Sequence, residues 1–318
     1  SNNSGMAISQ TAEGIYEFDN FATVNRLSGS TTNKRIEGYF LRTNYNFDNK
    51  YFFSASVRRD ASSVFSADAR WGNFYSAGFA WRIDKESFME DLTWIDKLKI
   101  RGSYGEVGND DLNDFFISQA RYGLTSNAGD PAIVWDDIGN SALQWETQET
   151  FDIAVEFGLF NGLIDGQIEY YKKNSTDLLY DLPIAPSNGL SSYPANVADM
   201  YNSGWEIALN SRLIKNADFS WDLSLQGSTF KNEITSLPDP FVSGSKRWEE
   251  GRSRFDYYIL HTAGVDPANG DQLFLMFELD ADGNTVPVLD TDGAQLTTND
   301  WEATERAYTG DNSIPDLL

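Results

Sequence analysis

The chain has 318 residues, and its 24 lysines and arginines are set against 48 aspartates and glutamates, which gives a formal net charge of −24. A protein this acidic lacks the clustered basic residues that nucleic-acid phosphates require, so nucleic-acid binding is excluded. The absence of cysteine removes disulfide bonds, thiolate catalysis and cysteine-based metal centres, and a single histidine removes histidine-rich centres. Aromatic residues make up 14% of the chain, which argues against disorder.

Apolar and polar residues alternate repeatedly along the chain up to about residue 226, and such alternation is typical of half-buried β-strands. In residues 39–47, for example, Leu41 and Tyr45 stand at odd positions, whereas Arg42 and Asn44 stand at even positions. The predicted strands cover residues 39–47, 51–60, 71–83, 97–104, 150–159, 164–170, 205–213 and 219–226. Most of these runs have about 9–12 residues, the length that a tilted strand needs to cross a bilayer.

The segments between the predicted strands alternate between short and long. Short turns are expected at Asp48-Asn49, at Asn161-Gly162 and at 215–218, with 84–96 as a longer member of the same set. Long connections are expected at 61–70, 108–144 and 173–203 and after residue 231. An up-and-down barrel gives this rhythm, because its turns lie at one rim and its loops at the other. The sequence therefore predicts an all-β fold that is part of an antiparallel transmembrane β-barrel, with short periplasmic turns and long extracellular loops.

A soluble β-sandwich is the alternative fold, because its strands also alternate. Sandwich strands average about five or six residues, however, and the runs in this chain are nearly twice as long. Trp81 lies near one end of its apolar row and Tyr75 lies toward the other end, which fits the aromatic girdles of a membrane barrel. Strand length and aromatic placement therefore favour the barrel.

Several longer strings resemble those of one family of transporters. They include residues 51–63, residues 98–109 and the string Arg70-Trp-Gly-Asn-Phe-Tyr-Ser-Ala-Gly-Phe-Ala-Trp-Arg82. Further strings follow at 143–146, 165–171, 176–179, 202–206, 230–234 and 264–270. In these strings, and in their order, the chain resembles the barrel of SusC/RagA-type TonB-linked (TonB-dependent) outer-membrane transporters. The resemblance covers residues 37–318.

The resemblance implies a barrel of about 22 strands that an N-terminal plug domain fills, in the outer membrane of a Bacteroidetes-type Gram-negative bacterium. It also implies TonB-dependent uptake of an oligosaccharide or a peptide, with outer-membrane lipid around the barrel and with the TonB complex and a SusD-like surface lipoprotein as partners.

Three regions are expected under this interpretation. Residues 1–36 form a loop and a weak strand that lead into the barrel, and residues 37–230 form barrel strands with extracellular loops. Residues 231–318 form an acidic extracellular loop and hairpin region with further barrel strands. The plug domain and the C-terminal strands are expected to be absent, so the chain is interpreted as a piece of the barrel.

Two rows of side chains follow from alternation in such a barrel. The polar row faces the lumen, where it holds the plug or lines the transit route. Its charged members include Arg42, Arg58, Arg82, Arg101, Asp152, Glu156, Glu206 and Asp222. The apolar row faces lipid and includes Tyr45, Phe79, Trp81, Ile100, Phe157, Leu209 and Trp221. For each residue of the polar row, the favoured interpretation is a solvated or plug-packing side chain that contacts no ligand, because lumen residues need no function to be polar.

Aromatic residues in the predicted loops are candidates for contact with the substrate or the partner lipoprotein, because such rings stack on sugars and anchor protein interfaces. They are Phe115, Phe116, Trp135, Tyr193, Tyr201, Trp248 and Tyr257. Packing of the loops on themselves is the alternative for each of these residues.

The sequence supports no enzyme chemistry. The adjacent carboxylates at Asp110-Asp111 and Asp136-Asp137 do not suit a catalytic pair, because neighbouring strand residues face opposite sides and loop carboxylates are usually solvated. His261 has no serine elbow or cysteine to activate. Phosphate-binding glycine motifs are also missing, so neither catalytic residues nor a cofactor are predicted.

Calcium is the one metal with a candidate site. Asp280, Asp282 and Asn284 carry oxygen ligands at alternate positions, as a calcium loop does. The EF-hand pattern is not matched, because Gly283 comes too early and Thr291 occupies the position of the required glutamate. A hairpin turn is the favoured interpretation of this segment, and calcium stays the alternative.

The competing function is that of a secreted or surface β-protein used for adhesion or glycan binding, without transport. Extraction separates the two hypotheses, because a membrane barrel requires detergent and a surface β-protein does not.

Overall fold

The computed structural model describes residues 2–10, 21–30, 33–111, 114–128, 130–185, 187, 189–190, 192–216, 218–281 and 283–309. Regular structure in these residues is β-strand, apart from short 3-10 turns such as η2 (Ile83–Lys85) and η3 (Ser87–Met89). Among the described residues, no helix has the length and apolar character needed to cross a membrane.

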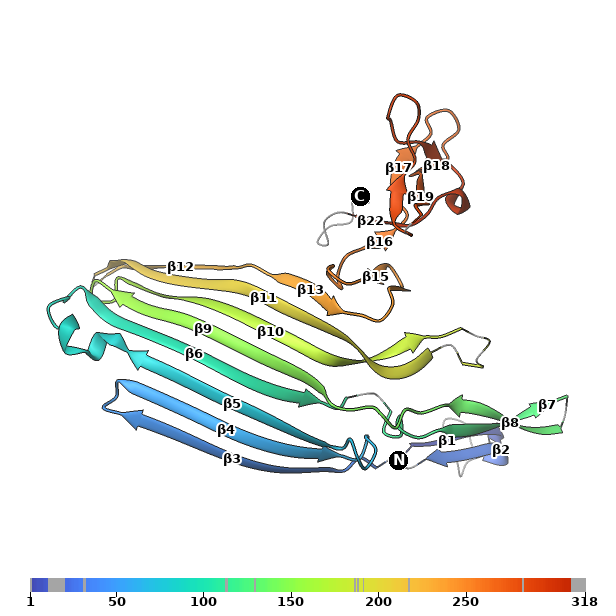
Figure 1. The fold of residues 1–318 in the computed structure, drawn as a ribbon, viewed down its shortest axis with the longest axis horizontal. Helices are drawn as coiled ribbons and strands as arrows, with labels where there is room; N and C mark the ends of the chain where they lie inside the picture. Colours follow the sequence, from blue (N-terminus) through green and yellow to red (C-terminus); the bar gives the residue numbers. More distant parts are fainter. Residues whose placement is uncertain are drawn as a thin grey trace.

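One antiparallel sheet of nine strands dominates the fold (Figure 1). Its main path runs, in spatial order, through β3 (Ile36–Phe47), β4 (Tyr51–Ser62), β5 (Trp71–Arg82), β6 (Ile95–Asn109), β9 (Glu146–Leu159), β10 (Ile164–Pro183), β11 (Ser192–Lys215) and β12 (Ser220–Ser228). The ninth strand, β13 (Lys231–Ser236), also pairs with β11. All eight predicted strands are present and antiparallel, so the predicted all-β fold is confirmed.

The short connections lie together at one end of the sheet, and the long ones lie at the other end (Figure 1). Asp48 and Asn49 have φ angles of 55° and 51°, the left-handed conformation that a tight hairpin turn demands. Asn161 and Gly162 are also left-handed, but they lie inside a four-residue connection at 160–163. The predicted two-residue turn is therefore wrong in its length, although the hairpin itself is confirmed.

The prediction of a long loop at 173–203 is wrong. β10 and β11 continue beyond the rest of the sheet as a paired ribbon, and only residues 184–191 connect them. The register shifts between Ser175 and Leu178, where Asp177 has a φ of 55°. Such a bulge interrupts the two-residue period, so alternation no longer marks the strand beyond it.

A hairpin of β7 (Arg121–Asn127) and β8 (Asp130–Asp137) lies within the connection between β6 and β9. At the start of the chain, β1 (Asn2–Gln10) pairs with β2 (Phe21–Ser30). Both hairpins lie toward the long-loop end of the sheet in Figure 1.

The connections at the long-loop end form a core of their own, which joins segments 63–70, 114–119 and 140–145. Its buried residues are Val64, Phe65, Ile117 and Leu143. The ring of Trp145 packs on that of Phe65 at 5.3 Å between centroids, and its indole nitrogen donates to the carbonyl of Arg70 at 2.9 Å. The long connections are therefore packed structures.

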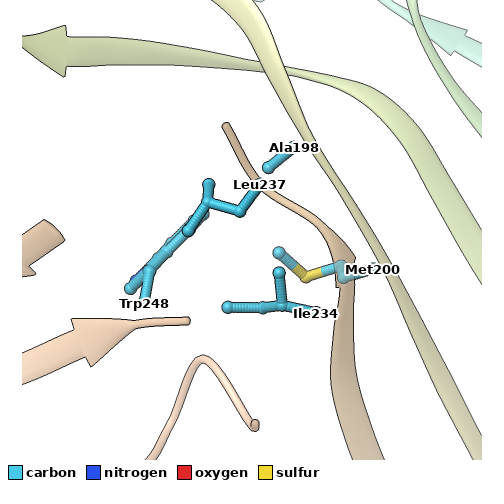
Figure 2. Packing of buried hydrophobic residues seen from close by; sticks show 5 residues of the cluster. All are labelled: Ala198, Met200, Ile234, Leu237 and Trp248. Atoms are coloured by element: carbon cyan, nitrogen blue, oxygen red, sulfur yellow. The ribbon is translucent and has the colours of Figure 1, made fainter. Parts of the chain in front are cut away.

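A second core covers the extension of β10 and β11 with β13, β14 (Phe241–Ser243) and β15 (Lys246–Trp248). Figure 2 shows its five buried residues grouped around one point: Ala198, Met200, Ile234, Leu237 and Trp248. The ring of Trp248 lies 5.0 Å from that of Tyr180 and 5.5 Å from that of Phe241. This core explains why the ribbon persists beyond the sheet.

The end of the described chain, up to residue 309, forms small sheets of short strands. They are β16 (Tyr258–Ile259) with β22 (Ala307–Tyr308), β17 (Thr262–Val265) with β18 (Gln272–Leu275) and β21 (Thr297–Thr298), and β19 (Phe277–Leu279) with β20 (Thr285–Pro287). The 3-10 turn η5 (Trp301–Ala303) follows β21. Among the described residues from 231 onward, β13 belongs to the main sheet, and the strands that follow it have two to four residues each.

Gly204 allows β12 and β13 to follow β11 almost as one strand. A Cβ atom at this position would lie 2.0 Å from the carbonyl oxygen of Thr229, so only glycine fits. The backbone N–H of Thr229 donates to the carbonyl of Trp205 at 2.9 Å. Beyond this close approach, Lys231 lies opposite Ser203.

Candidate functional site

The polar face of the sheet collects the charged residues that the sequence predicts for a lumen. The register pairs Arg42 with Ser56, and it pairs Arg101 with Ala80 on one side and Ala154 on the other. Each strand therefore adds its polar row to the same face. All eight predicted residues lie on this face: Arg42, Arg58, Arg82, Arg101, Asp152, Glu156, Glu206 and Asp222.

Six of the charged side chains on β6, β9 and β10 form one cluster, which we call the charge cluster. Its members are Lys97, Lys99, Arg101, Asp152, Glu156 and Glu169. The guanidinium of Arg101 is central, because it donates to Asp152 at 3.1 Å, to Glu156 at 3.2 Å and to Glu169 at 2.6 Å. The lysines add two further ion pairs to Glu156, at 2.7 Å and 3.1 Å. Three positive and three negative charges thus neutralise one another and tie three strands together.

Other charged residues of the polar face stand outside the charge cluster. Arg58 pairs with Asp60, and Arg82 pairs with Asp84. Within the part of the chain that the structure describes, Arg42 and Glu206 form no ion pair. The charges of these two side chains are therefore available to pair with another part of the protein or with a partner.

The opposite face of the sheet is predominantly apolar. The seven residues predicted to face lipid all lie on it: Tyr45, Phe79, Trp81, Ile100, Phe157, Leu209 and Trp221. Aromatic pairs lie near both ends of β5, where Trp81 stacks on Tyr51 at 6.2 Å and Trp71 stacks on Tyr39 at 6.3 Å. The two tryptophans are separated by about 33 Å of strand, or about 23 Å of height at a tilt of about 45°, which matches the apolar band of a membrane barrel, about 25 Å tall.

A carboxylate holds the aromatic pair at the short-turn end. The hydroxyl of Tyr51 and the indole nitrogen of Trp81 donate to Glu86 at 2.6 Å and 3.0 Å. These hydrogen bonds, with the ammonium of Lys50 at 3.6 Å, keep the pKa of Glu86 below its usual range. The polar ends of both rings are thereby fixed at the level where a girdle meets water.

The predicted loop aromatics lie in different environments. Trp248 is only 7% exposed and fills the second loop core, which favours the alternative of loop self-packing for this residue. Tyr193 and Tyr201 lie on β11, which extends through the predicted loop. The hydroxyl of Tyr201 donates to Glu233 at 2.8 Å, so this ring belongs to the sheet surface.

The remaining loop candidates keep some exposed surface. Phe115 packs against the first loop core, and Phe116 beside it is 39% exposed. Trp135 on β8 is 46% exposed and packs on Tyr122 at 4.4 Å between ring centroids. Tyr257 lies beneath the ammonium of Lys246, 3.0 Å from the ring centroid. The structure does not bring these residues together into one site.

The calcium candidate forms a hairpin turn. The carboxylate of Asp280 accepts the backbone N–H of Asn284 at 2.8 Å, and the connection joins β19 to β20. Gly283 has a φ of 80°, as the turn requires. Asp282 lies outside the described residues. Among the residues that the structure places, no group of three or more His, Cys, Asp or Glu side chains is arranged to hold a metal ion.

Sequence reasoning missed Lys97, Lys99 and Glu169 as members of the charge cluster. Lys97 and Lys99 alternate with apolar residues in the predicted strand at 97–104, but only the register shows that they point toward Glu156. Register depends on pairing between strands far apart in the chain, so no local signal reveals it.

Residues 3–313 match the family model described as TonB dependent receptor-like, beta-barrel. The chain is 30% identical over 313 residues to the TonB-dependent receptor P39 of Formosa agariphila, a match that covers 95% of this chain and 28% of the relative. It is 32% identical over 224 residues to the TonB-dependent receptor SusC of Bacteroides thetaiotaomicron, a match that covers 68% of this chain and 22% of that protein.

Two solved structures agree with these sequence matches. The RagAB peptide importer in the closed-closed state has a TM-score of 0.76 at 25% identity, over 92% of this chain and 31% of the importer chain. The RagAB peptide transporter has a TM-score of 0.80 at 24% identity, over 96% of this chain and 33% of that chain. The matches confirm the predicted resemblance to SusC and RagA. The chain spans between 22% and 33% of the length of these relatives.

Proposed function

We propose, since the chain belongs to the TonB dependent receptor-like β-barrel family, that the protein imports an oligosaccharide or a peptide in a TonB-dependent manner. As a member of this family, the chain lies in the outer membrane of a Gram-negative bacterium, and the family consists of transporters, not enzymes. The observation that carries the proposal is the two-faced sheet. Its strands are long enough to span a bilayer, one face is apolar, and the other face carries the neutralised charge cluster.

The polar face has a specific place in this proposal. It forms the lumen wall, because lipid does not accept charged side chains in the middle of a span. The charge cluster keeps three neighbouring strands in register, and Arg42 and Glu206 offer unpaired charges to the plug. A structural role without cargo contact fits the members of the charge cluster best, because their charges already pair with one another.

The long-loop end has the properties of a docking platform for a SusD-like lipoprotein. Its two cores fix the connections in defined positions, and fixed loops lose little conformational entropy when a partner binds. Exposed aromatic residues at this end, such as Phe116 and Trp135, are of the type that is enriched at protein interfaces. The similarity to the RagAB peptide importer supports a peptide as cargo, and an oligosaccharide stays the alternative that the resemblance implies.

The proposal is tested by uptake in the native host. Strains that lack the gene of the proposed SusD-like lipoprotein, or in which TonB is inactivated, are supplied with defined oligosaccharides and peptide pools as sole nutrient. We expect growth on one class of oligomer to be lost in both strains and growth on the free monomers to persist, because only large cargo needs the barrel. Unchanged uptake of every tested oligomer contradicts the proposal, as does release of the full-length protein without detergent.

A further inference from the structure

Three basic side chains of the described strands lie on the apolar face, where a charge in contact with lipid is destabilising. They are Arg59 on β4, Lys172 on β10 and Lys231 on β13, and we call them the cationic row. Arg59 lies opposite Tyr39 in the register, within the apolar row of β3 and β4. Ser203 lies opposite both Lys172 and Lys231, so these two lysines share its face.

The cationic row lies at one level of the sheet. Arg59 is the ninth residue of β4 counted from Tyr51, and Lys172 is the ninth residue of β10 counted from Ile164. Both strands start at the short-turn end, so both residues are about 26 Å of strand away from it, or about 18 Å in height at a tilt of about 45°. The long side chains reach the remaining few ångströms to the border of an apolar band about 25 Å tall.

Each cation of the row lies over an aromatic ring. The guanidinium of Arg59 is 4.8 Å from the ring centroid of Trp71. The ammonium groups of Lys172 and Lys231 are 4.7 Å and 5.5 Å from the same ring, that of Tyr201. Tryptophan and tyrosine are enriched where a bilayer meets water, and a cation over such a ring is held at headgroup level.

Glu233 neutralises Lys231 at 2.7 Å and also attracts Lys172, so Arg59 and Lys172 are the two cations of the row without an ion-pair partner among the described residues. Glu106 and Glu149 lie opposite each other on the same face, but further from the short turns than the cationic row. The cations therefore lie between these carboxylates and the apolar band. Basic residues are outnumbered two to one in this chain, with a net charge of −24, yet three of them gather at this level of the apolar face.

We infer that the cationic row binds the phosphate groups of a phosphorylated lipid in the outer leaflet. An apolar face below the cations accepts the acyl chains, and the cations complement the phosphates at the level where the chains end. The inference rests on the proposed function in one respect: the long-loop end must be extracellular for the cationic row to lie in the outer leaflet.

The test uses two matched double variants of the full-length protein. Arg58 and Arg59 are neighbours that face opposite sides of β4, and Lys172 and Lys173 are neighbours that face opposite sides of β10. The variant R59Q/K172Q removes two cations from the apolar face, and the control R58Q/K173Q removes two from the polar face. Each protein is reconstituted into phosphatidylcholine nanodiscs, and binding of bisphosphorylated lipid A is compared with binding of dephosphorylated lipid A.

We expect R59Q/K172Q to bind the bisphosphorylated lipid at least about tenfold more weakly than the unchanged protein, since each cation near the surface contributes roughly fivefold. The control is expected to bind within about twofold of the unchanged protein. All three proteins are expected to have the same affinity for the dephosphorylated lipid. Equal affinity of all three proteins for the bisphosphorylated lipid overturns the inference while leaving the proposed function intact. Failure of the unchanged protein to insert into the nanodiscs contradicts both.

Discussion

Replacement of Trp248 by alanine is expected to open the loop segment around residues 237–256 without removing the sheet from the membrane. Trp248 is 7% exposed, and its ring packs against the rings of Tyr180 and Phe241. Truncation of a buried tryptophan costs about 3–5 kcal/mol, which raises the open population of the segment at least about a hundredfold. Trypsin then reaches Lys246 and Arg247, which are half-buried in β15. Cleavage on intact cells therefore measures the effect, because it follows the open population when opening is fast.

The matched control for this variant is Trp135→Ala. Trp135 also lies at the long-loop end, but it is 46% exposed. We expect the control to leave trypsin cleavage within about threefold of the unchanged protein, since surface substitutions usually change stability by about 0.5 kcal/mol or less. Equal protection of the Trp248→Ala protein and the control would show that the second loop core does not stabilise the segment.

Replacement of Arg101 by methionine is expected to destabilise the folded barrel by about 1–3 kcal/mol. Arg101 bridges Asp152, Glu156 and Glu169, and Glu169 lies directly opposite Glu206 in the register. Loss of the guanidinium leaves two like charges facing each other, which destabilises a strand pair. We place the effect below the cost of breaking a fully buried ion pair, because the Arg101 side chain is 30% exposed. Urea unfolding in detergent, followed by tryptophan fluorescence, measures the change.

A double variant and a control locate this effect in the charge cluster. Arg101→Met combined with Glu169→Gln is expected to recover part of the loss, because the second substitution removes the opposed charge. Arg42→Met is the control, since Arg42 lies on the same face but forms no ion pair within the described residues. A loss in the Arg42→Met protein as large as in the Arg101→Met protein would contradict the special role of the charge cluster.

The sequence allowed the sheet to be predicted wherever a strand separates two different environments. In β9, for example, Phe157 and Glu156 stand next to each other because the two faces of the strand meet apolar and polar surroundings. The same reasoning failed for the extension of β10 and β11. There the bulge at Asp177 breaks the period, and the apolar residues face a loop core in place of lipid.

The candidate site was predictable to a similar depth. Alternation placed Arg101 and Asp152 on one face, but it gave no information about which carboxylates Arg101 bridges. Arg101 and Glu169 are 68 residues apart in the chain and meet across β9, so their contact depends on register. The burial of Trp248 escaped prediction for a related reason, since its partners come from β10, β11 and β14.

The central claim is that one face of the sheet meets lipid and the other does not. The 318 residues contain no cysteine, so once any cysteine elsewhere in the full-length protein is replaced, single cysteines at positions 151 to 157 in β9 carry a nitroxide spin label without background. In reconstituted full-length protein, we expect labels at Phe151, Ile153, Val155 and Phe157 to collide with oxygen, which concentrates in lipid. Labels at 152, 154 and 156 are expected to prefer the water-soluble nickel chelate or to be shielded from both reagents. Collision rates that lack this two-residue period, or that show the opposite phase, would contradict the account.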